Sequence, residues 1–133
     1  MKLEPNMYVR TKYNGIGKIV EYINDPTHYF FKCYKLDINC INCEEYITEA
    51  DVIKEPSYNI IDLLQVGDFI DGKQVVNAIH CKDGFNRIEL FGGKAIMNKT
   101  PIKSIVTKEQ FSSMEYRLGG KEWKKLIIHL WEH

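Results

Sequence analysis

The residues best suited to chemistry are the cysteines and histidines that could hold a metal ion. Cys40 and Cys43 have the two-residue spacing of one half of a structural zinc site. Such a site takes four ligands. The residues that could complete it are His80 with Cys81, or His28 with Cys33. A single Cys-x-x-Cys pair is a weak indication of zinc, and the alternative is two loop thiols without a special role. We therefore expect no cofactor and keep zinc as the alternative.

A second set of residues combines aromatic rings with positive charge. Nucleobases stack on aromatic side chains, while neighbouring Lys and Arg side chains pair with phosphate. The candidates for contacting such a ligand are Tyr29, Phe30, Lys32, Tyr34, Lys35, Phe85, Arg87 and Phe91. If these rings are exposed, they favour a nucleotide ligand. If they are buried, the remaining surface of mixed charge suits a protein partner.

Catalytic motifs are missing from the sequence. It contains none of the phosphate-loop, dinucleotide, zinc-protease or serine-hydrolase patterns. Gly92 and Gly93 followed by Lys94 could bind an anion through backbone N–H groups, but such a pair between two strands is more often a turn. We expect a non-enzymatic binding protein, with a small enzyme acting on nucleotides as an alternative.

The charge balance restricts the partners. Eighteen basic residues face eighteen acidic ones, and only three of the basic residues are Arg. Without net charge there is no global field toward a phosphate backbone, so long duplex DNA is not an expected partner. No apolar run reaches the roughly 18 residues of a membrane span, and no secretory signal is recognisable. We expect a cytoplasmic protein with reduced cysteines.

Two β-hairpins are the strongest structural prediction. Asn14-Gly15 and Asp71-Gly72 each lie between runs of β-forming residues, 57 positions apart. Both dipeptides suit the two positive φ angles of a type I′ turn. The first hairpin is predicted over residues 7–23, where Gly17 indicates a bulge or a close backbone approach.

The remaining segments repeat this plan. Strands are predicted within residues 29–37, 45–56, 86–91, 94–97 and 102–107, and a short linker helix within 57–68. The order is typical of small SH3-like or Tudor-like barrels. We predict a mainly β (α+β) protein with two antiparallel modules, residues 1–56 and 57–106, followed by C-terminal helices over 107–133. Residues 47–52 and 106–111 fall at matching places, which a weak internal duplication explains most simply; two unrelated hairpins that share common turn chemistry are an equal alternative.

The C-terminal segment changes to helical periodicity. Thr107 and Gln110 have the spacing of a capping box, and Phe111 begins an apolar stripe. Residues 121–133 predict an amphipathic helix whose apolar face needs a partner surface. That surface is either the chain's own sheet or a second copy, which would make a homodimer.

Three segments resemble small uncharacterised proteins of phages and prophages of AT-rich Gram-positive bacteria such as clostridia. They are residues 5–22 (PNMYVRTKYNGIGKIVEY), 59–75 (NIIDLLQVGDFIDGKQV) and 102–120 (IKSIVTKEQFSSMEYRLGG). This group includes inhibitors of host immunity. The resemblance implies an antagonist of host anti-phage defence, acting in the host cytoplasm by occluding a defence nuclease or sequestering a nucleotide immune signal. A nucleic-acid-binding accessory protein of the phage is the alternative.

Overall fold

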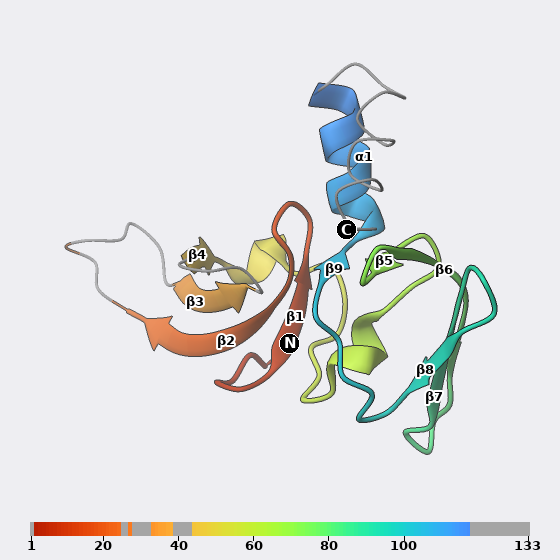
Figure 1. Ribbon diagram of the computed structural model, residues 1–133. Helices are drawn as coiled ribbons and strands as arrows, with labels where there is room; N and C mark the ends of the chain where they lie inside the picture. The colour runs from red at the N-terminus through yellow and green to blue at the C-terminus, as the bar shows by residue number, and fades with distance from the viewer. Residues whose placement is uncertain (1, 25–26, 28–32, 39–43, 118–133) are drawn as a thin grey trace. The chain divides into compact units, whose positions relative to one another are not determined.

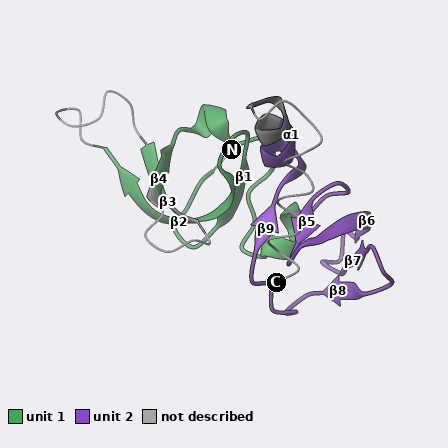
Figure 2. Ribbon diagram, turned by 45° about the horizontal axis from the view of Figure 1, so that its top comes forward, with its two compact units in different colours: residues 1–63 green, residues 64–133 purple. Residues whose placement is uncertain are grey.

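The computed structural model describes residues 2–24, 27, 33–38 and 44–117. They belong to two compact units, residues 1–63 and 64–133 (Figure 2). Unit 1 carries a four-stranded antiparallel sheet and unit 2 a five-stranded one. The described part of the chain contains one short α-helix. This confirms a mainly β protein with two antiparallel sheets. Neither sheet closes into a barrel within the described residues.

Unit 1 is built around four strands in sequence order (Figure 1). They are β1 (Tyr8–Thr11), β2 (Gly15–Ile23), β3 (Cys33–Ile38) and β4 (Glu44–Ile47). Alternate residues of these strands point to one side, where they form a buried cluster that includes Val9, Ile19, Leu36 and Ile47. This cluster is the apolar core of the unit.

After β4 the chain returns to the first strand. The 3-10 turn η1 (Glu49–Asp51) leads into a segment that bridges β1 in antiparallel fashion, at Thr11 with Val52 and at Tyr8 with Ser57. The backbone N–H of Tyr8 donates to the Ser57 carbonyl at 2.7 Å. The second 3-10 turn, η2 (Ile60–Leu63), lies within the predicted linker helix. Residues 52–57 therefore cover the outer edge of β1.

The first hairpin is confirmed, but its predicted turn type is wrong. Thr11 pairs with Gly15, so three residues form the turn and not two. Gly15 has φ of 72°, whereas Asn14 is not among the described residues with positive φ. The Thr11 hydroxyl accepts a hydrogen bond from the Asn14 N–H and donates one to the Gly15 carbonyl, which stabilises this longer turn. The register shift of β2 falls at Val20 and not at Gly17.

Unit 2 contains the second hairpin, and here the prediction is confirmed. Its strands are β5 (Phe69–Ile70), β6 (Lys73–His80), β7 (Asn86–Leu90), β8 (Ala95–Met97) and β9 (Ile105–Val106), in the order β8-β7-β6-β5-β9. Ile70 pairs with Lys73. Asp71 and Gly72 have φ of 49° and 81°, as a type I′ turn requires.

The two units share several irregular features. The second strand of each hairpin has a register shift, at Val20 and at Val76. In each unit a later segment returns to pair with the first strand: residues 52–57 with β1, and β9 with β5. β-Bulges are common in antiparallel pairs, so these shared features leave both the duplication and two unrelated hairpins as explanations.

The helix α1 (Lys108–Arg117) begins at the predicted capping box. The Thr107 N–H donates to the Gln110 side chain at 3.0 Å, and the Gln110 N–H donates back to the Thr107 hydroxyl at 3.2 Å. The Phe111 ring stacks on Phe69, with centroids 4.7 Å apart, which fixes the helix to β5. The helix predicted over residues 121–133 lies outside the described residues.

Candidate functional site

The candidate ligand-binding residues divide between the two units. Tyr34 and Lys35 belong to unit 1, whereas Phe85, Arg87 and Phe91 belong to unit 2. The candidates outside the described residues are Tyr29, Phe30 and Lys32 and the zinc candidates His28, Cys40 and Cys43.

Tyr34 and Lys35 point to opposite faces of β3. Tyr34 packs beside the core of unit 1, and its ring centroid lies 5.0 Å from that of Tyr22. Burial raises the pKa of Tyr34, and the negative charge of Glu49 raises this pKa further. Lys35 lies in a row with Glu21 and Tyr46 on the other face. The two candidates therefore cannot contact the same side of one flat ligand.

Unit 2 brings its three candidates to one face of β7. Asn86, Ile88 and Leu90 are buried, so the alternation of the strand turns Phe85, Arg87, Glu89 and Phe91 to solvent. Hydrogen bonds extend the ladder beyond both ends of β7. The Cys81 N–H donates to the Phe85 carbonyl at 2.9 Å, and the Phe91 N–H donates to the Gln74 carbonyl at 2.8 Å. Phe85 and Phe91 are 47% and 73% exposed.

Strands β6 and β8 lie on either side of β7 (Figure 1) and contribute apolar and polar neighbours. The register places Arg87 between Ile79 and Met97, and Glu89 between Asn77 and Ala95. The Glu89 carboxylate accepts a hydrogen bond from the Asn77 amide at 3.3 Å and lies 3.7 Å from Arg87 Nε. We call these eight residues the β7 face: Phe85, Arg87, Glu89, Phe91, Ile79, Met97, Asn77 and Ala95.

The sequence predicted Phe85, Arg87 and Phe91 but not the other residues of the β7 face. The two-residue period through residues 85–91 was the available signal for Glu89. Ile79 and Met97 required the strand register, because they come from β6 and β8. Both are partly exposed, at 38% and 43%.

A buried amide fixes β7 from the opposite side. Asn86 is 1% exposed, and its side-chain N–H groups donate to Asn98 Oδ1 at 2.8 Å and to the Gly84 carbonyl at 3.3 Å. Its Oδ1 lies 2.6 Å from His80 Nδ1, while His80 Nε2 lies 2.8 Å from the Leu64 carbonyl. This network holds the start of β7 against β6 and the residues before β5.

The same network bears on the zinc hypothesis. Both ring nitrogens of His80 face protein acceptors, so His80 would have to leave them to bind a metal ion. Cys81 follows on the opposite side of the strand and is exposed. Within the described ranges, no group of three or more His, Cys, Asp or Glu side chains could hold a metal ion.

The glycine pair after β7 forms a hairpin turn. Gly92 and Gly93 have φ of 98° and 93°, and the Leu90 N–H donates to the Lys94 carbonyl at 2.8 Å. Only glycine adopts such angles without strain. This is the turn that the sequence favoured over an anion-binding loop.

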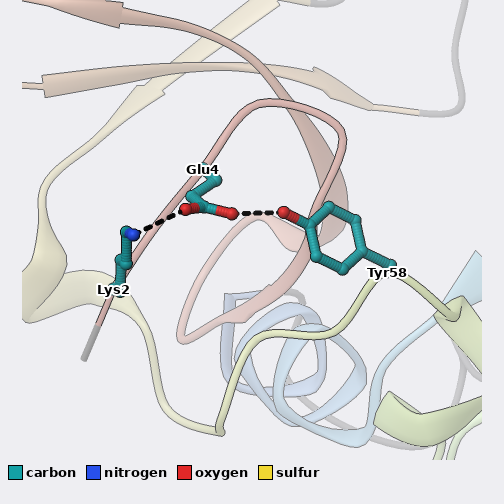
Figure 3. Close-up of polar contacts among 3 residues, drawn as sticks. All are labelled: Lys2, Glu4 and Tyr58. Atoms are coloured by element: carbon teal, nitrogen blue, oxygen red, sulfur yellow. Dashed lines mark hydrogen bonds and ion pairs between the residues drawn. The ribbon is translucent and has the colours of Figure 1, made fainter.

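Unit 1 has a polar contact between its first residues and Tyr58, which follows the segment 52–57 along the edge of β1 (Figure 3). The Tyr58 hydroxyl donates a hydrogen bond to Glu4, and Lys2 Nζ lies 3.0 Å from the same carboxylate. The hydrogen bond from Tyr58 is the main cause that lowers the pKa of Glu4, and Lys2 adds to it. The same bond raises the pKa of Tyr58. The contact is exposed and fixes the leading segment.

No family model, curated protein or solved structure gives a significant match to the chain. Among the described residues, no helix has the length and apolar character needed to cross a membrane.

Proposed function

We propose that the chain is a non-enzymatic, phage-encoded binding protein that antagonises a host anti-phage defence. The observation that carries this proposal is the β7 face. It combines two exposed Phe rings with Arg87 and Met97, and aromatic residues, Arg and Met are enriched where proteins bind one another. The resemblance of three segments to phage and prophage proteins supports the role in defence.

A protein partner suits the β7 face better than a small nucleotide. Small ligands are usually enclosed in a concave pocket, whereas the β7 face is one side of an antiparallel sheet. Occlusion of a defence nuclease is therefore the preferred mode. Sequestration of a nucleotide signal stays the second mode, because exposed Phe rings beside Arg87 also suit base stacking.

We also propose that each unit is a divergent SH3-like or Tudor-like module. Four features of unit 1 support this: a tight first hairpin, a long second strand with a bulge, a 3-10 turn after β4, and a last segment that returns to β1. Unit 2 has the hairpin, the bulge and the returning strand.

The decisive experiment is phage plating on a host that carries a defence system. Expression of the full chain should restore plaques, and the double substitution Phe85→Ala with Phe91→Ala should abolish the rescue. Tyr13→Ala is the matched control, because Tyr13 is a 62% exposed ring in unit 1. Its rescue should equal that of the unmodified protein. Loss of rescue by both variants, or by neither, contradicts the assignment to the β7 face.

The mode is tested with purified protein. Inhibition of the defence nuclease in the absence of any nucleotide supports occlusion. Thermal-shift measurements against cyclic and ADP-ribose-type nucleotides test sequestration, with single-stranded and duplex DNA as comparison ligands. A shift with DNA that falls steeply with added salt would instead support a nucleic-acid-binding accessory protein.

A further inference from the structure

The solvent-facing residues along β7 form a symmetric pattern. Residues 85–91 read FNRIELF. Every second side chain points to solvent, which gives the order Phe85, Arg87, Glu89, Phe91. An aromatic residue stands at each end, and a base and an acid stand in the middle. The pattern is self-complementary about its centre at Ile88.

A two-fold axis that relates two copies of the chain brings these complementary residues opposite one another. We place the axis between two facing sheets, perpendicular to β7 and passing over Ile88. Rotation by 180° about this axis reverses the strand direction, so position 87 meets position 89 of the second copy. Arg87 then faces Glu89 of the second copy, and Phe85 faces Phe91. Each of these contacts occurs twice, as a two-fold interface requires.

We infer that the β7 face binds a second copy of this chain. The charge complementarity is the main argument, because a two-fold axis parallel to β7 would instead oppose Arg87 to Arg87 and Glu89 to Glu89 of the second copy. The Arg87 and Glu89 side chains are 42% and 40% exposed, and Arg87 Nε lies 3.7 Å from Glu89 Oε1. Because of this exposure, both the guanidinium and the carboxylate are accessible to a second copy. The same contact buries the exposed rings of Phe85 and Phe91.

The neighbouring strand supports the same arrangement. Met97 and Ala95 are separated by one residue on the outer side of β8, in register with Arg87 and Glu89. The axis that pairs Arg87 with Glu89 also places Met97 over Ala95 of the second copy. A long apolar side chain opposite a small one allows two sheets to pack closely.

This inference goes beyond the proposed function and does not depend on it. The same face cannot hold a second copy and a defence protein at once. A partner therefore has to displace the second copy, and the free protein has its exposed Phe rings covered until then.

Mixing two charge-reversal variants tests the interface. Arg87→Glu puts two acids at positions 87 and 89, and Glu89→Arg puts two bases there. Each variant alone should be mainly monomeric, because the opposed like charges should raise the dissociation constant of its homodimer roughly a hundredfold. An equimolar mixture should form a heterodimer, because each acid then faces a base. Neither variant retains the Arg87–Glu89 pair within one chain, so recovery in the mixture reports only the contact between chains.

Native mass spectrometry and light scattering of the full chain give the readout. The unmodified chain of 15.6 kDa should have the mass of two chains. Circular dichroism establishes that each variant is folded. Lys94→Glu is the control, since it makes the same charge change at an exposed turn residue next to the face. It should leave the dimer intact.

Three results would overturn the inference. The first is a monomeric unmodified protein at millimolar concentration. The second is a dimer that persists in both single variants, which would assign self-association to another surface such as residues 121–133. The third is a mixture of folded variants that forms no heterodimer. Phage rescue by an unmodified protein that proves to be monomeric would leave the proposed function standing while the dimer fails.

Discussion

Asp68 Oδ1 accepts a hydrogen bond from the backbone N–H of Lys108 at 2.9 Å, across 40 residues of sequence. Its other oxygen accepts one from the Gln65 N–H at 2.7 Å. Asp68 is fully buried. One carboxylate thus connects the turn before β5 to the first turn of α1, where a negative charge also complements the helix dipole.

Asp68→Asn should destabilise unit 2 by about 2 to 3 kcal/mol, because the amide NH₂ opposes one of two backbone donors in a buried site. Hydrogen exchange should report the change at amides of α1 and β5. Asp83→Asn is the control: Asp83 accepts a single bond from the Phe85 N–H at an exposed turn. Equal effects of the two substitutions would contradict the role of Asp68.

The Asp71 side chain has a role besides its place in the turn. Asp71 Oδ1 accepts hydrogen bonds from the N–H groups of Lys103 and Ser104, at 2.9 and 2.8 Å. Asp71→Ala should cost about 1 to 2 kcal/mol, from both the lost acceptor and the positive φ. Asp71→Asn keeps the acceptor oxygen and tolerates positive φ, so it should cost less than half as much. Urea unfolding monitored by circular dichroism compares the two.

Asn86 holds the underside of β7. Asn86→Ala removes two donated hydrogen bonds and one accepted bond from a buried site, and should destabilise unit 2 by about 3 kcal/mol. Asn86→Asp keeps the acceptor for His80 but opposes the oxygen of Asn98, so it should also destabilise. Asn24→Ala, at an exposed position, should change the free energy of unfolding by less than about 0.5 kcal/mol. If Asn86→Ala has the same melting temperature as the unmodified protein, the hydrogen-bond network around Asn86 is dispensable.

The contact between Glu4 and Tyr58 predicts a pH dependence with a definite sign. The pKa of Glu4 is lowered in the folded protein, so its contribution to stability is present at neutral pH and is lost as pH falls through that pKa. The pKa of Tyr58 is raised, so the neutral phenol contributes at neutral pH and this contribution is lost as pH rises through the raised value.

Tyr58→Phe is the direct test of this contact. The substitution should return the pKa of the Glu4 carboxyl toward its ordinary value, since the hydrogen bond from Tyr58 is the main cause of the shift. NMR titration of the Glu4 side-chain carboxyl measures this. Tyr13→Phe, at another exposed tyrosine of unit 1, should leave the Glu4 titration unchanged. A Glu4 pKa unaffected by Tyr58→Phe would contradict the contact.

Local chemistry explains which parts of the fold were predictable from sequence. Asp71-Gly72 and the Thr107–Gln110 capping box form as expected, because each is determined by a few neighbouring residues. Asn14-Gly15 has the same local pattern but a different turn, because the Thr11 side chain binds both Asn14 and Gly15. That contact competes with a two-residue turn and is not visible in the dipeptide itself.

The candidate site was predictable only in part. Phe85 and Arg87 were candidates because they combine an aromatic ring with positive charge, but cross-strand neighbours such as Met97 depend on register. Tyr34 and Lys35 were grouped by composition, and the strand places them on opposite faces. The β2 bulge at Val20 follows from pairing with β3, so no single glycine could indicate it.

The return of residues 52–57 to β1 brings two parts of unit 1 that are far apart in sequence into contact, and the Tyr8 N–H donates to the Ser57 carbonyl at 2.7 Å. A segment whose ends meet in this way can be grafted into a surface loop of an unrelated carrier or have its ends joined and reopened elsewhere. A chain opened between Asn14 and Gly15 would keep the pairing of β1 with β2 and with residues 52–57, and would lose only the loop that joins β1 to β2.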